Sequence, residues 1–80
     1  MPSPSENEVP AGLVNGTTGF DGNPVFTLAY LPADVNQLHL YVAGYRMRLG
    51  IHFTVSGQTI TFLAPFIPVA GDFILADYPF

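Results

Sequence analysis

The sequence predicts an all-β fold: a small antiparallel β-sandwich or a barrel-like meander of roughly six or seven short strands. Two observations support this prediction. Apolar and polar residues alternate over several short stretches, which is the period of a strand and not the spacing of three and four typical of a helix. Turn residues separate these stretches at intervals of about ten residues, as in small sandwiches and barrels.

Residues 1–10 are predicted to be an extended or disordered N-terminal arm in front of a single β-domain of residues 11–80. The arm is rich in Pro, Ser and acidic residues, with Val9 as its one sizeable apolar side chain besides Met1, so it cannot form a core. A proline-rich segment of this length spans about 30 Å. It would reach across a neighbouring subunit through Val9 and its proline rings, Pro10 included; a tail without a role is the other interpretation.

The first part of the domain is expected to hold one short and one longer strand. Ala11–Val14 is a strand candidate that ends at the turn signal Asn15–Gly16, and residues 17–24 are expected to form a loop. Residues 24–30 alternate between larger and smaller side chains and predict a strand. Its larger side chains are Phe26, Leu28 and Tyr30.

A hairpin is predicted over residues 38–49, with Ala43–Gly44 as its turn. This turn sets apolar residues opposite one another on one face, because directly opposed residues share a face. The apolar pairs are Val42 with Tyr45, Leu40 with Met47 and Leu38 with Leu49. The other face pairs Tyr41 with Arg46 and His39 with Arg48. Because alanine adopts positive φ poorly, a type II turn is expected rather than type I′.

A second hairpin is predicted over residues 51–62, with Ser56–Gly57 as its turn. Its apolar face pairs Phe53 with Ile60 and Ile51 with Phe62. Its other face pairs Thr54 with Thr59 and His52 with Thr61. Residues 64–71 then form a connection, and residues 72–78 a last strand. The pattern of that strand leaves its inward set open, either Phe73 and Leu75 or Ile74 and Ala76.

The composition indicates that apolar surface remains exposed on a monomer. Hydrophobic residues make up 49% of the chain and charged residues 10%, against about 25% charged in an ordinary soluble domain. A chain of this size buries only roughly 60% of its unfolded surface, and it has no cysteine for a disulfide or a thiolate-bound zinc. We therefore expect association with copies of itself or with a larger partner.

Several classes of function are disfavoured. A net charge of −4, with two arginines and no lysine, lacks the basic patch that nucleic acid requires. No apolar run approaches the ~18 residues of a membrane helix, so no membrane contact is expected. The first residues have neither the basic nor the apolar region of a secretory signal, which indicates a cytoplasmic origin.

No catalytic residue, metal site or cofactor is predicted. His39 and His52 lie on polar strand faces, without a close carboxylate or a third ligand in the sequence pattern. Asp72 and Asp77 are five residues apart on one strand and point to opposite faces, so a turn role for Asp72 is favoured.

The candidate interface residues are Tyr41, Arg46, Arg48, Val9 and Pro10. Tyr41 over Arg46 is either a cation–π pair or a plain cross-strand pair on a solvated face. Tyrosines at positions 30, 41, 45 and 78 are candidates for stacking on sugars, although Tyr30 and Tyr45 lie on apolar faces where core or subunit packing is the commoner role.

Nearly the whole chain after Pro10 carries a series of short motifs, each of which occurs once. The motifs are Gly12-Leu-Val-Asn-Gly16, Phe26-Thr-Leu28, Leu38-His-Leu-Tyr41, Gly44-Tyr-Arg46, Gly50, Phe53-Thr54, Gly57-Gln-Thr-Ile-Thr-Phe62, Ala64-Pro65 and Gly71-Asp72 to Tyr78. They resemble a small β-domain of tailed-bacteriophage virion proteins, of the tail-fibre, head-fibre and decoration type. The chain departs from that pattern at Ala43–Gly44, where the family has Asn-Gly, at His52–Phe53, where it has an acid and an aromatic, and in its longer loop over residues 17–24.

The resemblance implies a structural, non-enzymatic bacteriophage virion protein, such as a capsid decoration, head-fibre or connector subunit. Such a protein acts through protein–protein contacts with other virion proteins and with itself, and a homotrimer is expected by analogy. It would be assembled in the host cytoplasm and reside in the virion. The alternative is a carbohydrate- or host-receptor-binding module of a phage fibre, with a glycan as its partner.

Overall fold

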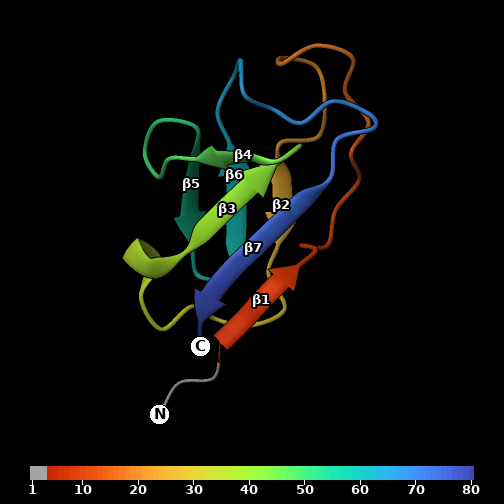
Figure 1. The fold of residues 1–80 in the computed structure, drawn as a ribbon. Helices are drawn as coiled ribbons and strands as arrows, with labels where there is room; N and C mark the ends of the chain where they lie inside the picture. Colours follow the sequence, from red (N-terminus) through yellow and green to blue (C-terminus); the bar gives the residue numbers. More distant parts are fainter. Residues whose placement is uncertain (1–3) are drawn as a thin grey trace.

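The computed structural model describes residues 4–80, which form two small antiparallel sheets packed face to face (Figure 1). The larger sheet has the order β1-β7-β3-β4 and the smaller one the order β2-β6-β5. The strands of the larger sheet are β1 (Pro4–Glu8), β7 (Ile74–Pro79), β3 (His39–Val42) and β4 (Tyr45–Met47). Those of the smaller sheet are β2 (Val25–Thr27), β6 (Thr59–Phe62) and β5 (Phe53–Ser56). The predicted all-β, sandwich-like fold is confirmed.

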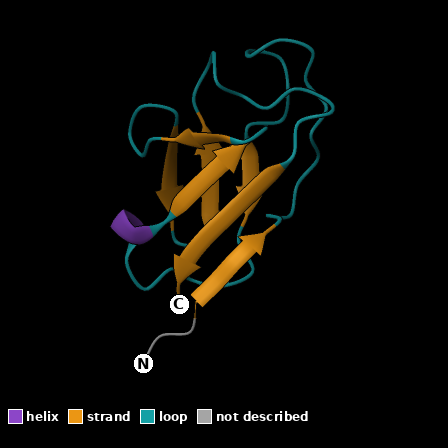
Figure 2. Cartoon of the chain, viewed as in Figure 1, coloured by secondary structure: helices purple, strands orange, loops and turns teal. Residues whose placement is uncertain are grey.

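The helical content of residues 4–80 is one short 3-10 turn, η1 (Val35–Gln37), which Asp34 caps by accepting a hydrogen bond from the N–H of Asn36 (Figure 2). Within these residues, no helix is long and apolar enough to span a membrane.

The predicted register of the first hairpin is confirmed within β3 and β4, but its turn type was predicted wrongly. Leu40 lies opposite Met47, Tyr41 opposite Arg46 and Val42 opposite Tyr45. Ala43 has φ of 52° and Gly44 has φ of 88°, and positive φ at both central positions defines a type I′ turn. The twist of that turn matches the twist of paired strands, and the pairing imposes it despite the cost at Ala43.

The register predicted for the second hairpin is wrong by two residues. Phe53 lies opposite Phe62 and Val55 opposite Ile60, so the turn falls at Gly57–Gln58, one residue later than expected. A shift of two leaves the side-chain faces unchanged. Phe53, Ile60 and Phe62 therefore still face inward, as the alternation predicts.

The core lies between the two sheets. The rings of Phe26 and Phe62 pack in a T-shaped arrangement, with centroids 5.6 Å apart. In the last strand the open choice is resolved: β7 pairs with β3 so that Ala76 lies opposite Leu40 and Ile74 opposite Val42, and both β7 residues are buried. The buried hydrophobic side chains are Phe26, Leu28, Leu38, Leu40, Val42, Phe53, Ile60, Phe62, Ile74, Ala76 and Tyr78.

The N-terminal segment differs from the expectation. The structure places Pro4–Glu8 in β1 at the edge of the larger sheet, paired with β7 of the same chain, so the folded part does not begin at residue 11. An edge strand tolerates proline, and β1 covers an otherwise open edge of β7. The expected strand over Ala11–Val14 is reduced to a bridge, in which Ala11 and Thr27 exchange two main-chain hydrogen bonds of 2.8 Å. The prediction for residues 1–3 lies outside the described residues.

Candidate functional site

The outer face of the larger sheet brings together the predicted pair Tyr41 and Arg46. They are directly opposed on β3 and β4, with Tyr41 half-buried and Arg46 exposed. Leu75 of β7 lies on the other side of Tyr41. The row Leu75–Tyr41–Arg46 therefore crosses three strands on the face turned away from the core.

Beyond this row, β4 presents part of a free strand edge. Val42 and Tyr45 flank the two-residue turn and exchange main-chain hydrogen bonds, so by alternation the N–H and C=O of Arg46 point away from β3. The main-chain groups of Arg48, two residues further on, already have partners. Its N–H donates to Nδ1 of His52 at 2.8 Å, and its carbonyl accepts from the N–H of Ile51 and of His52. The free edge is thus centred on Arg46.

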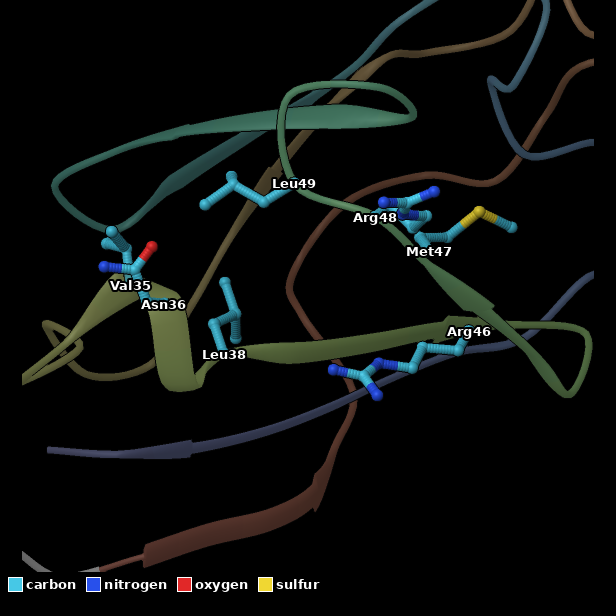
Figure 3. A pocket seen from close by; sticks show the side chains of 7 residues that line it. All are labelled: Val35, Asn36, Leu38, Arg46, Met47, Arg48 and Leu49. Atoms are coloured by element: carbon cyan, nitrogen blue, oxygen red, sulfur yellow. The ribbon is translucent and has the colours of Figure 1, made fainter.

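A groove of about 490 Å³ lies between η1 and the end of β4 (Figure 3). Leu38 and Leu49 project into it and make its middle apolar, while Arg46 and Arg48 stand on the β4 side. The lining residues are Val35, Asn36, Leu38, Arg46, Met47, Arg48 and Leu49.

Both arginines are exposed, and they are the only Lys or Arg residues of a chain with net charge −4. Among the side chains that the structure describes, neither guanidinium group forms an ion pair or hydrogen bond. An arginine without a carboxylate partner is well suited to bind an anionic group of another molecule, because its donors form a planar fork.

The other two candidate interface residues, Val9 and Pro10, lie away from the arginines. They follow β1, which is at the opposite edge of the same sheet (Figure 1). Val9 is 69% exposed and remains available for contacts. Pro10 is buried in the domain and is not available as a contact residue.

The histidines have local roles. The ring of His52 accepts from Arg48 and meets Phe66 edge-on, with centroids 4.4 Å apart. His39 lies opposite Asp77, a neighbour that the sequence did not indicate because the register of β7 was open. Among the side chains that the structure describes, no group of three or more potential metal ligands comes together.

Two aspartates organise loops. Asp72 accepts a hydrogen bond of 3.1 Å from the N–H of Val69, which is the predicted turn role. Asp21 holds the predicted loop by accepting from the N–H and hydroxyl groups of Thr17 and Thr18. The hydroxyl of Thr17 and the main-chain N–H groups of both threonines stabilise the carboxylate form and lower the pKa of Asp21 well below its usual value.

We expect this carboxylate to stabilise the fold only when it is ionised. Because its pKa is lower in the folded than in the unfolded state, its contribution is present above the ordinary aspartate pKa of about 3.9 and is lost as the pH falls below it. Asp21→Asn should therefore lower Tm at pH 7, and the difference from the native chain should shrink below pH ~4. Thermal melts across this pH range test the prediction, and a difference independent of pH contradicts it.

A hydrogen-bonded cluster that no sequence pattern indicates joins β1, β7 and the chain after β2. The hydroxyl of Tyr78 donates to Oε1 of Glu8 at 2.6 Å and accepts from the N–H of Tyr30 at 3.2 Å. Oε2 of Glu8 accepts from the N–H of Ala29 at 3.1 Å. The cluster joins residues that are 21, 48 and 70 positions apart, so no local pattern reports it.

Large apolar side chains remain exposed over much of the surface, as the composition predicts. Tyr45 is 75% exposed, although it shares the inward direction of Val42, and Tyr30 stacks on Phe80 at the surface with centroids 3.9 Å apart. The exposed large hydrophobic residues are Val9, Leu13, Phe20, Val25, Tyr30, Leu31, Val35, Tyr45, Leu49, Ile51, Phe66 and Phe73.

No family model, curated protein or solved structure matches the chain.

Proposed function

We propose that this chain is a structural, non-enzymatic protein of a bacteriophage particle, a decoration, head-fibre or connector subunit that acts through protein–protein contacts. It would be assembled in the host cytoplasm and bind other virion proteins as well as copies of itself. The motif resemblance described above supports the phage assignment.

The observation that carries the contact function is the exposed apolar surface. Phe20, Tyr45 and Phe73 are each at least 60% exposed in a chain with 10% charged residues. Large exposed apolar side chains in this number on a small domain favour a contact with another protein. Burying this apolar surface in an assembly would also stabilise the fold, because a chain of 80 residues has a small core and this one has no cysteine for a disulfide.

Mass spectrometry of purified particles tests the particle assignment. Particles are taken from a lysate in which the chain is expressed together with its neighbouring genes, and are banded twice on a density gradient. Because the two arginines are close together, chymotrypsin is a better protease than trypsin here. We expect peptides of the chain at a fixed ratio to the major capsid protein. Their absence from infectious particles would overturn the proposal.

Self-association, with a trimer as the preferred state, predicts a stability that depends on concentration. Binding between folded copies favours the folded state by mass action. A hundred-fold increase in chain concentration should therefore raise Tm by several degrees, as measured by calorimetry or circular dichroism. A constant Tm together with a constant monomer mass would remove self-association from the proposal.

Glycan binding at a fibre is the second candidate, supported by the exposure of Tyr45. This ring stands beside a groove of about 350 Å³ that Phe66 and Asp72 also line, and aromatic rings next to acidic groups suit the binding of sugars. The chain has no tryptophan, so tyrosine emission reports binding directly. A glycan that quenches this emission in the native chain but not in Tyr45→Ala would favour this candidate; no quenching across a glycan panel would reject it.

A further inference from the structure

We propose that the groove between η1 and the end of β4 binds an acidic peptide segment of another protein. An apolar side chain of that segment enters the middle of the groove, and its carboxylates bind Arg46 and Arg48. This inference rests on the contact function proposed above and names one of the surfaces that carries it, together with the chemistry of the partner.

The groove forms where the first hairpin opens. The pairing of β3 with β4 stops two residues short of Leu38 and Leu49, although the apolar alternation continues that far. The N–H of Leu38 donates instead to the carbonyl of Val35 in η1, at 3.2 Å, and Leu49 forms a bridge with Phe53. The two leucines therefore project into the groove from opposite sides (Figure 3).

Hydrogen bonds hold both walls of the groove in place. On the η1 side, Asp34 accepts from the N–H of Asn36 at 2.9 Å. On the β4 side, the N–H of Arg48 donates to Nδ1 of His52, and the ring of His52 packs edge-on against Phe66. A site that is already ordered in the free chain loses less conformational freedom when it binds a ligand.

The groove also leaves apolar surface for a ligand to cover. Val35 and Leu49, which belong to opposite walls, are 38% and 39% exposed. The volume of about 490 Å³ lies within the range of roughly 300–1,000 Å³ found for ligand-binding clefts. An apolar side chain placed between the two walls would remove this surface from water, which favours binding. The ligand therefore needs an apolar group.

The charges beside the groove select an anionic ligand. Arg46 and Arg48 are the only Lys or Arg residues of the chain, and both line this groove. No acidic side chain is among the described residues that line it. A carboxylate of a ligand would thus meet two exposed guanidinium groups without a competing carboxylate, and it can accept two parallel hydrogen bonds from each.

The lining favours a peptide over an acidic sugar. Among the described lining residues there is no aromatic ring for a sugar to stack on, and Asn36 is the one uncharged polar side chain. A second copy of the chain is disfavoured as the ligand, because the acidic side chains that the structure describes already have partners within their own chain. These side chains are Glu8, Asp21, Asp34, Asp72 and Asp77.

A titration of the isotope-labelled chain, followed by heteronuclear NMR at low salt, tests the proposal. The probe is a capped peptide with a central leucine and two glutamates on each side. We expect the signals of the groove residues, Val35 and Leu49 among them, to shift as the peptide is added. The double variant Arg46→Gln/Arg48→Gln should bind the peptide at least about tenfold more weakly, because it removes both guanidinium groups.

The control for net charge is the double variant Thr54→Glu/Thr59→Glu. It adds two negative charges at exposed positions of the other sheet, so its net charge equals that of the arginine double variant. We expect it to bind the peptide as the native chain does. Tm is measured for each variant to confirm that it is folded.

A second peptide, with alanine in place of the central leucine, tests the apolar part of the site. The native chain should bind it several-fold more weakly than the leucine peptide. Leu49→Gln, which makes one wall polar, should bind the two peptides about equally.

Three results would overturn the inference: no shift of the groove signals with the leucine peptide, equal affinity of the native chain and the arginine double variant, or binding of a uronic-acid oligomer in the groove without binding of the peptide. Peptides of the chain in purified particles would in each case still support the proposed function. Absence of the chain from particles would reject that function whatever the titration shows, so the two failures are distinguishable.

Discussion

Replacing Phe53 by alanine is expected to lower the free energy of unfolding by about 3–5 kcal/mol. The side chain is fully buried, and its ring lies 6.3 Å from that of Phe62, its cross-strand partner. Truncation would leave a cavity between two sheets that are held apart by other large side chains, so collapse could fill little of it. Denaturant unfolding followed by far-UV circular dichroism measures the loss.

Two further variants test whether the loss of stability depends on burial of the side chain. Leu40→Ala, in the centre of the other sheet and also fully buried, should cost about 2–5 kcal/mol. Thr59→Ala, on the outward face of β6, should change the free energy of unfolding by less than about 1 kcal/mol. A loss at Thr59 equal to that at Phe53 would mean that the faces of the second hairpin are assigned wrongly.

Removing the hydroxyl of Tyr78 should lower the free energy of unfolding by about 1.5–3 kcal/mol, because it deletes a hydrogen bond to a charged group. Tyr78→Phe keeps the buried ring, which is 3% exposed, but removes the donor to Glu8 and the acceptor for the N–H of Tyr30. The loss should appear together with faster amide exchange in β1, since Glu8 is a side-chain link between β1 and the core.

Tyr41→Phe is the matched control. Its ring is half-buried on the outer face, and its hydroxyl forms no hydrogen bond with the side chains or main chain that the structure describes. We expect a change within about 0.5 kcal/mol. Equal losses at Tyr41 and Tyr78 would show that the Glu8 contact contributes nothing specific.

The parts of the fold predicted correctly are those set by neighbours in sequence. In the first hairpin, the turn and the apolar alternation agree on one register, so Tyr41 and Arg46 are paired correctly. In the second hairpin, a glycine at position 57 serves a turn at either Ser56–Gly57 or Gly57–Gln58. The two registers differ by two residues and bury the same faces, so hydrophobic pattern alone does not separate them.

The parts that were not predicted depend on distant segments. Residues 4–8 look like a polar tail because their composition carries no information about the open edge of β7, which begins only at Ile74. The groove beside Arg48 was not predicted for the same reason, because separate segments line it: Val35 belongs to η1, and Leu49 follows β4. Tyr45 follows the inward alternation but stays exposed, because it lies at the end of the short strand β4.

The central claim, that the exposed apolar surface is a protein-contact surface, is tested most directly by hydroxyl-radical footprinting. The chain is labelled once as a dilute monomer and once within purified particles, and oxidation is measured residue by residue by mass spectrometry. We expect the buried residues Phe53 and Phe62 to react weakly in both states, and Tyr45 and at least part of the exposed apolar set to react several-fold less in the particle. Equal oxidation of the exposed apolar residues in both states would contradict the claim.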